Sequence, residues 1–294
     1  MTVAPADLAL ATAPSERRRR IRDYVRRHPT IVMGGLGLGL MALIAILAPY
    51  LGTTDPQALS PIQRLRWPSA THWFGTDMLG RDVYSRTIYG ARVSLTVGLS
   101  VALLSITFGL SLGLVTGFNR WADAVLMRVM DGLMSIPAVL IAIALMALTR
   151  ASLENVVFAI TVAEVPRVTR LVRGVVLTLR DLPFVEAAVA GGTSLPRILW
   201  RHIMPNTLPP LLVQGTYTAA SAMLIEAILS FLGAGTPPNI PSWGNIMAEG
   251  RSLFQVAYYI VLFPGGFLSV TVLAMNLLGD GLRDALDPRL SRRM

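Results

Sequence analysis

Residues 31–51 read IVMGGLGLGLMALIAILAPYL, a run of 21 residues without a charged side chain. About 20 helical residues, each adding about 1.5 Å, cross a hydrocarbon core of about 30 Å. The length and composition of the run therefore predict a transmembrane helix. The whole chain has the same character, because 53% of its 294 residues are hydrophobic and only 15% are charged, against about 25% charged in soluble domains.

Other apolar runs predict an all-α, polytopic membrane protein with six transmembrane helices. The predicted spans are 31–51, 93–118, 132–148, 155–165, 207–234 and 255–279. The fourth is short and contains Glu164, so it requires neighbouring helices that shield this carboxylate from lipid. An even number of spans places both termini on the same side of the membrane.

The arginines predict which side that is, because loops rich in arginine stay in the cytoplasm. With a cytoplasmic N-terminus, 19 of the 26 basic residues fall on the cytoplasmic side and 7 on the outer side. We therefore expect both termini to be cytoplasmic and the protein to lie in the plasma or inner membrane. The predicted layout is a basic cytoplasmic N-terminal tail (1–30), a first transmembrane helix (31–51), an extracytoplasmic loop (52–92), a transmembrane core (93–280) with a cytoplasmic loop (181–206), and a cytoplasmic C-terminal tail (281–294).

Composition excludes several classes of function. All 26 basic residues are arginine, which excludes a Walker A phosphate loop and Schiff-base catalysis, since both need lysine. The chain has no cysteine, which excludes thiolate catalysis and Cys-ligated zinc. Its arginines lie mostly between apolar runs rather than along one face, which argues against nucleic acid as a partner. The histidines lie outside the predicted spans and form no HExxH motif, which argues against an intramembrane hydrolase. We expect no catalytic residue and no metal site.

Glycines spaced four residues apart predict close helix packing. The pairs are Gly35 with Gly39, Gly109 with Gly113, and Gly113 with Gly117. Such small-xxx-small pairs let two helix backbones approach each other.

The loop between the fourth and fifth spans contains two short predicted helices. Asp181 can cap the first, which has Pro183 in its first turn. Gly191 and Gly192 end it, because glycine accepts the left-handed conformation found at helix C-termini. Thr193 or Ser194 can cap the second, which runs to Pro205. We call residues 181–206 the elbow.

The first helix of the elbow is composed almost entirely of small or apolar residues. An exposed helix of this kind favours a protein partner, because its alanines allow close approach and Phe184 can fill a pocket. Within the elbow, Glu186-Ala187-Ala188, Gly192 and Ile203-Met204-Pro205 resemble the EAA motif of ABC-importer permeases, the loop that docks into a cleft of the ATPase subunit. The predicted ATPase-coupling residues are Phe184, Glu186, Ala187, Ala188, Gly192, Ile203 and Pro205.

Outside the elbow, the segment GTDMLGRD at 75–82 resembles the signature of the dipeptide/oligopeptide/nickel permease family. Its signature residues are Gly75, Asp77, Gly80, Arg81 and Asp82. Later blocks similar to the family are FLG at 231–233, PSWGN at 241–245, AEGR at 248–251 and NLLGDGLRD at 276–284. The ordered blocks identify the chain as a member of this family, of the DppC/OppC type, and imply the type I ABC-importer permease fold.

The resemblance implies a permease for di- or oligopeptides that pairs with a homologous permease and two ATP-binding subunits. An extracytoplasmic binding protein would deliver the substrate, and ATP and magnesium would bind to the partner subunits, leaving this chain without a cofactor. A permease for nickel or another small solute is an alternative. A proton-coupled secondary transporter is a second one, because Asp131, Glu164 and Glu226 could relay protons.

Several charged residues have two open roles. Glu226 lies within the fifth predicted span, where it is either a pathway residue that meets a substrate ammonium or a hydrogen-bonding partner of a neighbouring helix. We expect Glu164 at the membrane interface and Asp131 as a first-turn or helix-contact residue.

Charged residues outside the spans also have alternative roles. Asp77 and Asp82 match no calcium loop, so we expect a turn fixed by side-chain hydrogen bonds with Arg81 as partner. Arg167, Arg170 and Arg173 recur on one helical face and would contact either anionic lipid headgroups or an ATPase.

Overall fold

The computed structural model describes residues 28–286, which contain helices and no strand. The helices are α2 (Pro29–Leu47), α3 (Val83–Phe118), α4 (Arg120–Met134), α5 (Ala138–Leu148), α6 (Leu153–Arg180), α7 (Pro183–Ala190), α8 (Leu195–Ile198), α9 (Met204–Phe231), α10 (Trp243–Gly250) and α11 (Tyr259–Leu286). Shorter segments are η1 (Ala48–Tyr50), η2 (Pro61–Gln63), the π-helical η3 (Leu199–Ile203) and η4 (Arg251–Leu253).

Four helical stretches are long and apolar enough to cross a membrane, or five if the bent pair α4–α5 forms one span. The four are 29–50, 83–118, 195–231 and 259–286. Helices α4 and α5 meet at an angle of 93°, where Pro137 precedes α5. The predicted span 155–165 lies within α6, which does not reach the same apolar character because its second half carries arginines. Six transmembrane helices and their orientation therefore remain predictions.

Helix α6 continues through Pro166 to Arg180, so the predicted loop does not begin at residue 165. This difference has a packing cause. Gly109, Gly113 and Gly117 of α3 each face a valine of α6, namely Val168, Val172 and Val176. An added Cβ at any of the three would come within 2.6 Å of that valine. The prediction that these glycines form a helix-packing face is confirmed, and the contact extends α6 beyond the proline.

The other predicted glycine pair, Gly35 with Gly39, is wrong. Neither has any atom within 4 Å of an added Cβ. Helix α2 instead packs through Gly34, whose Cβ would lie 2.5 Å from the backbone nitrogen of Leu278 on α11. The spacing identified a glycine-rich helix, but the side of the helix that meets its neighbour depends on the tertiary structure.

Helix α3 is central to the buried core. Its residues pack with α2, α9 and α11 in one cluster and with α5, α6 and α9 in a second. It begins at Val83, before the predicted span at 93, because Asp82 caps it by accepting the Ser85 backbone N–H at 2.8 Å. Arg92, which marked the predicted boundary, donates instead to the Ala45 and Ile46 carbonyls at the end of α2.

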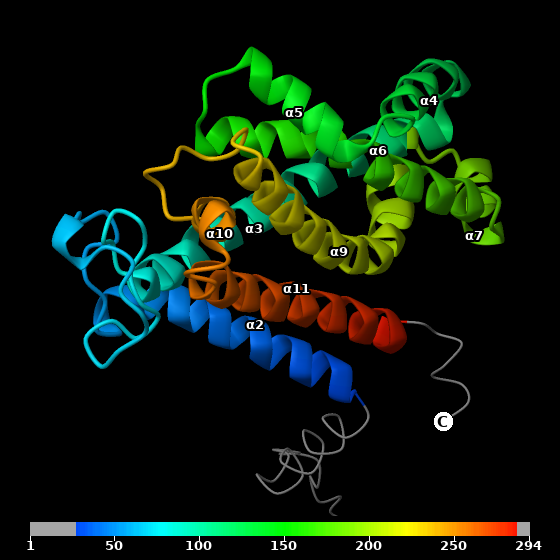
Figure 1. Cartoon of the computed structure of the whole chain (residues 1–294). Helices are drawn as coiled ribbons and strands as arrows, with labels where there is room; N and C mark the ends of the chain where they lie inside the picture. The colour runs from blue at the N-terminus through cyan, green and yellow to red at the C-terminus, as the bar shows by residue number, and fades with distance from the viewer. Residues whose placement is uncertain (1–27, 287–294) are drawn as a thin grey trace, which may run out of the picture.

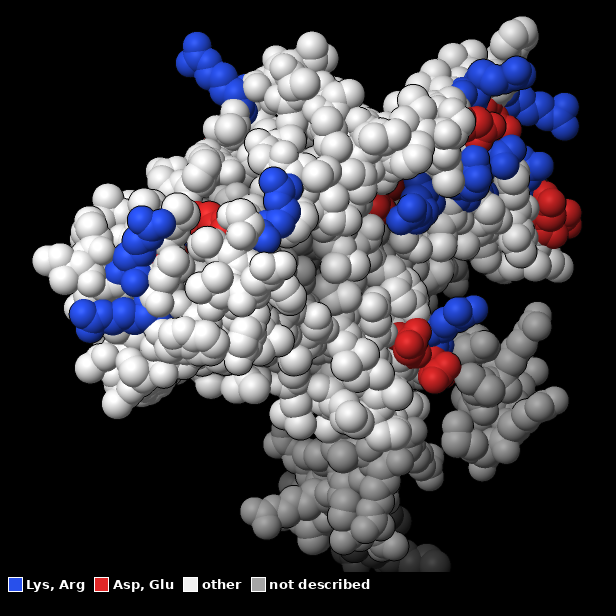
Figure 2. Space-filling view, viewed as in Figure 1, with Lys and Arg blue, Asp and Glu red and all other residues white. Residues whose placement is uncertain are grey.

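The short helices and loops that connect the long helices lie at two opposite ends of the molecule. Figure 1 shows α4, α7 and the end of α11 toward the right, and segment 51–82 and α10 toward the left. In Figure 2 basic and acidic side chains gather at the right-hand end, a few further basic side chains lie toward the left, and most of the surface between them is uncharged. Helix α11 runs to Leu286, so the predicted C-terminal tail is helical at its start. Most of the predicted N-terminal tail and residues 287–294 lie outside the described residues.

Candidate functional site

The elbow follows α6 directly. Helix α6 ends at Arg180, and Asp181 lies at its C-terminal cap position instead of capping the next helix as predicted. Leu182 occupies the N-terminal cap position of α7 and makes no side-chain cap. Pro183 begins α7, as predicted. Gly192 adopts φ +74°, and the Thr193 N–H donates to the Ala188 carbonyl at 3.0 Å. The left-handed glycine turn therefore reverses the chain between the two helices, as the sequence indicates.

The second helix of the elbow does not end before the next span. Residues 195–231 form one continuous helical stretch that contains α8, η3 and α9. The π-helical turn at 199–203 precedes Pro205, which lies in the first turn of α9. Proline has no N–H to donate, and it follows the π-helical turn, where the regular hydrogen-bond ladder of the helix is interrupted. The elbow is thus joined rigidly to a membrane-spanning helix.

Buried side chains fix the elbow to α6. Val185, Ile198 and Ile203 pack with Val172 and Val176 in one cluster, and each is at most 2% exposed. Ile203 therefore anchors the elbow to α6 and does not lie on its exposed side, and its coupling role stays a prediction. The sequence could not separate these roles, because an apolar residue in a short helix suits either one.

The opposite side of the elbow is exposed and largely apolar. Phe184 is 42% exposed and Val189 58% exposed, and Glu186, Ala187 and Pro205 are also exposed. Ala188 is half-buried. The Phe184 ring lies 6.3 Å from that of His202, between centroids. We call Phe184, Glu186, Ala187, Val189 and the exposed Leu195 the elbow face.

The arginine row of α6 makes ion pairs within the chain, and its predicted contacts with lipid headgroups or an ATPase stay predictions. Arg170 pairs with Asp131 of α4 at 2.5 Å, and Arg173 pairs with Asp123 of the same helix. Asp131 lies near the end of α4. Its ion pair with Arg170 is a contact between two helices, which is one of the two roles expected for it. The ion pairs attach α4 to the half of α6 that leads into the elbow.

The two other predicted carboxylates are fully buried. Glu164, which we expect at the membrane interface, is 0% exposed within the protein and accepts from Ser221 of α9 at 3.0 Å. Arg167, one turn along, lies 3.0 Å from its Oε2. Glu226 is also 0% exposed and accepts from Ser230 of its own helix at 2.8 Å. Its Oε2 has no hydrogen-bond partner among residues 28–286.

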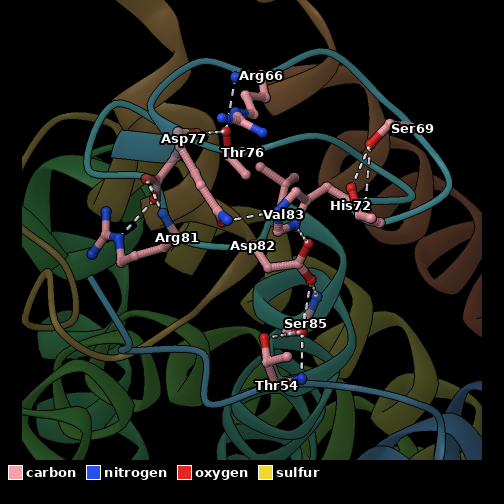
Figure 3. Close-up of polar contacts among 12 residues, drawn as sticks. Thr54, Arg66, Ser69, His72, Thr76, Asp77, Arg81, Asp82, Val83 and Ser85 are labelled. Carbon is pink, nitrogen blue, oxygen red and sulfur yellow. Dashed lines mark hydrogen bonds and ion pairs between the residues drawn. The ribbon is translucent and has the colours of Figure 1, made fainter. Parts of the chain in front are cut away.

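The signature at 75–82 forms the expected side-chain-fixed turn (Figure 3). Asp77 Oδ1 accepts the backbone N–H groups of Leu79 and Arg81, at 2.8 and 2.9 Å. Arg81 Nε donates to Asp77 Oδ2 at 2.7 Å. Gly80 has φ +74°, and its added Cβ would lie 1.8 Å from the Ser60 carbonyl oxygen, so only glycine fits there.

Asp82 connects this turn to α3 (Figure 3). Its Oδ2 accepts from the Ser85 backbone and hydroxyl, and its Oδ1 lies 3.0 Å from His72 Nδ1. Asp82 therefore helps to hold the segment 51–82 to the first turn of α3. Within residues 28–286 no group of three or more His, Cys, Asp or Glu side chains could hold a metal ion.

Sequence reasoning missed two members of this cluster. Arg86 is 1% exposed and lies 2.5 Å from Asp77 Oδ2. Glu249 of α10 accepts from Arg81 and Arg86, both at 2.6 Å. The signal for Glu249 was its place in the family-like block at 248–251, and Arg86 lies four residues after the signature at 75–82.

Comparison with known proteins gives consistent results. Residues 105–292 match the family described as "Binding-protein-dependent transport system inner membrane component". The probable peptide ABC transporter permease protein y4tQ of Sinorhizobium fredii is 52% identical over 97% of this chain and 100% of its own length. The dipeptide transport system permease protein DppC of Alkalihalophilus pseudofirmus is 41% identical over 97% of this chain and 93% of its own.

A solved structure shares the fold. A chain of the MetNI methionine ABC transporter, described in inward-facing conformations, superposes with a TM-score of 0.57 at 20% identity. The match covers 69% of this chain and 96% of that chain. This likeness supports the predicted type I importer fold.

Proposed function

This chain belongs to the inner membrane components of binding-protein-dependent transport systems, as a permease of the peptide ABC importers, and on that premise we propose that it forms half of a translocation pathway for di- or oligopeptides. The other half is a homologous permease. Two ATP-binding subunits supply the energy, with ATP and magnesium bound to them, and an extracytoplasmic binding protein delivers the peptide. Both termini and the elbow face the cytoplasm in this arrangement.

The observation that carries the proposal is the two-sided construction of the elbow. Its inner side is anchored to α6 by Val185, Ile198 and Ile203. Its outer side exposes a cluster of apolar groups. Such a cluster is unusual on a protein surface that faces only water. A partner subunit that moves the elbow face therefore moves α6 and α9 with it, which gives a mechanical route from ATP hydrolysis to the membrane helices.

The charges around the elbow face specify the partner further. Arg197 and Arg201 are exposed on its second helix, and Glu186 is exposed on its first. We expect the ATP-binding subunit to present an apolar cleft for Phe184 and an acidic rim for these arginines. Docking should then weaken as salt concentration rises, because charges at an interface rim are screened.

The test is co-purification of the tagged chain with its ATP-binding subunit from cells that express the whole importer. Glu186→Arg with Ala187→Trp places a bulky side chain and a reversed charge on the exposed elbow face. The matched control is Thr178→Trp, which adds the same bulk at an exposed position on α6 outside the elbow. We expect the control to retain the ATP-binding subunit and the double variant to lose it, with equal membrane insertion of both.

Equal retention by the double variant and the control would contradict the docking role. Transport by the purified chain alone on a pH gradient would instead support the proton-coupled alternative. Uptake of nickel or another small solute, with no uptake of peptides, would support the small-solute alternative.

A further inference from the structure

A cavity of about 320 Å³, lined by both apolar and polar groups, lies beside α10, at the end of the molecule opposite the elbow. Ser230 and Thr236 line it from the end of α9 and the following loop, and Ala248, Glu249 and Arg251 line it from α10 and η4. Its volume lies at the lower limit of pockets that bind small molecules, about 300 Å³.

The cavity wall is fixed before any ligand binds. Asn245 donates its side-chain amide to the carbonyls of Thr236, Pro237 and Ile240, at 3.0 to 3.1 Å. The Ser230 hydroxyl is committed to Glu226 at 2.8 Å. Gly235 packs against Ser230 so closely that an added Cβ would lie 2.2 Å from its hydroxyl oxygen. A preformed wall lowers the entropic cost of binding.

The carboxylate of Glu249 does not set the charge of the cavity. Its two oxygens accept from Arg81 and Arg86, and Asp77 lies against the same two guanidiniums. Two positive and two negative charges therefore balance within this cluster. An anion that enters the cavity meets a neutralised carboxylate rather than a free one.

Arg251 is the other charged residue that lines the cavity. It is exposed and has no carboxylate within salt-bridge distance among residues 28–286. Its guanidinium carbon lies 5.3 Å from the centroid of the Phe231 ring, an arrangement that orients the planar group without using its N–H donors. A guanidinium whose N–H donors are free is complementary to a carboxylate, because the charges are opposite and the two groups can form paired hydrogen bonds.

We infer that this cavity binds the free C-terminal carboxylate of a small peptide, with Arg251 as the counter-ion. The inference rests on the proposed function, since it names a contact between the permease and its substrate at the outer end of the pathway. It assigns a binding role to a cavity that the elbow mechanism does not use.

The absence of cysteine from the chain allows a direct test. Ala248→Cys places one thiol in the cavity wall of this chain, and Gln255→Cys places one at an exposed position outside it. The full importer in membrane vesicles, with its other subunits free of reactive cysteine, is labelled with a maleimide in the presence of alanyl-alanine or of its C-terminal amide. The free acid should slow labelling at 248 and not at 255, and the amide should protect far less.

Arg251→Gln, added to Ala248→Cys, should raise the alanyl-alanine concentration for half-protection about tenfold, because a charge-assisted hydrogen bond is lost. Arg251→Lys should retain part of the protection by keeping the charge. Equal protection by acid and amide, or unchanged protection in Arg251→Gln, would overturn the inference. Absence of peptide uptake by the wild-type importer would instead contradict the proposed function, so the two failures are distinguishable.

A contact between Arg251 and the binding protein is the rival explanation. In that case Arg251→Gln would reduce delivery by the binding protein while leaving peptide protection at Ala248→Cys unchanged. That result would also overturn the inference.

Discussion

Arg86 of α3 and Glu249 of α10 lie 163 residues apart in the chain and form a paired ionic contact, NH1 to Oε2 at 2.6 Å and NH2 to Oε1 at 2.9 Å. Asp77, which is 0% exposed, lies against the same guanidinium. The contact therefore joins segment 51–82, α3 and α10 through groups that are largely removed from water.

Neutralising Asp77 should destabilise this cluster. Asp77→Asn leaves Arg81 and Arg86 with Glu249 as their only counter-ion there, and breaking a buried ion pair typically costs about 3–5 kcal/mol. We expect a lower melting midpoint of the purified importer, with Asp181→Asn as control. Asp181 pairs with Arg180 at the surface, where an ion pair contributes about 0–1 kcal/mol. Equal midpoints for the two variants would show that the cluster adds nothing to stability.

Enlarging Gly113 should separate α3 from α6. Gly113→Ala places a Cβ 2.5 Å from Val172 Cβ, and overpacking of this kind costs about 1–3 kcal/mol. The loss should appear as lower thermal stability and be partly restored by Val172→Gly, which removes that Cβ, although glycine within a helix itself costs about 1 kcal/mol. Gly132→Ala is the control, because nothing lies within 4 Å of its added Cβ. A double variant whose loss of stability equals the sum of the two single losses would show that the clash is not with this valine.

Substitution of Gly192 should destabilise the elbow because of the backbone conformation at this position and not because of a steric clash. No atom lies within 4 Å of an added Cβ, but φ is +74°, where a side chain costs about 1–2 kcal/mol. Gly192→Ala should accelerate hydrogen exchange of elbow amides and weaken retention of the ATP-binding subunit. Gly192→Asn should do less, since asparagine tolerates this conformation.

Gly174 of α6 provides the matched control for Gly192. Its added Cβ also meets nothing within 4 Å, and its φ is not positive. Gly174→Ala should therefore leave exchange at the elbow unchanged. Similar effects at positions 174 and 192 would refute the backbone explanation.

Glu164 should serve as a hydrogen-bond acceptor rather than a proton carrier. Glu164→Gln keeps an oxygen for Ser221, whose hydroxyl donates to Glu164 at 3.0 Å. ATP-driven peptide uptake should remain near wild type in Glu164→Gln. In Glu164→Leu the Ser221 donor is left unpaired at a cost of about 1–3 kcal/mol, and importer yield should fall. Loss of uptake in Glu164→Gln at normal yield would favour the proton-relay alternative.

Local patterns predicted several features well. The 31–51 run predicted the apolar helix near the N-terminus, the positive-φ turn at Gly192 followed from its glycine pair, and the Asp77–Arg81 turn followed from short-range spacing. Each depends on residues close together in the chain. Helix ends were less predictable, because Arg92 and Pro166 suggested boundaries that neighbouring helices override through capping and packing.

Composition and motif order were enough to predict an apolar helical membrane protein of this permease family, because both are properties of the linear chain. The contacts of Ile203 with α6, of Arg170 and Arg173 with α4, and of Glu249 with Arg86 became visible only in the folded chain. Those outcomes depend on which faces of distant helices meet. A buried charged side chain is removed from water and therefore needs a counter-ion inside the protein. The packing of distant helices determines which counter-ion it meets.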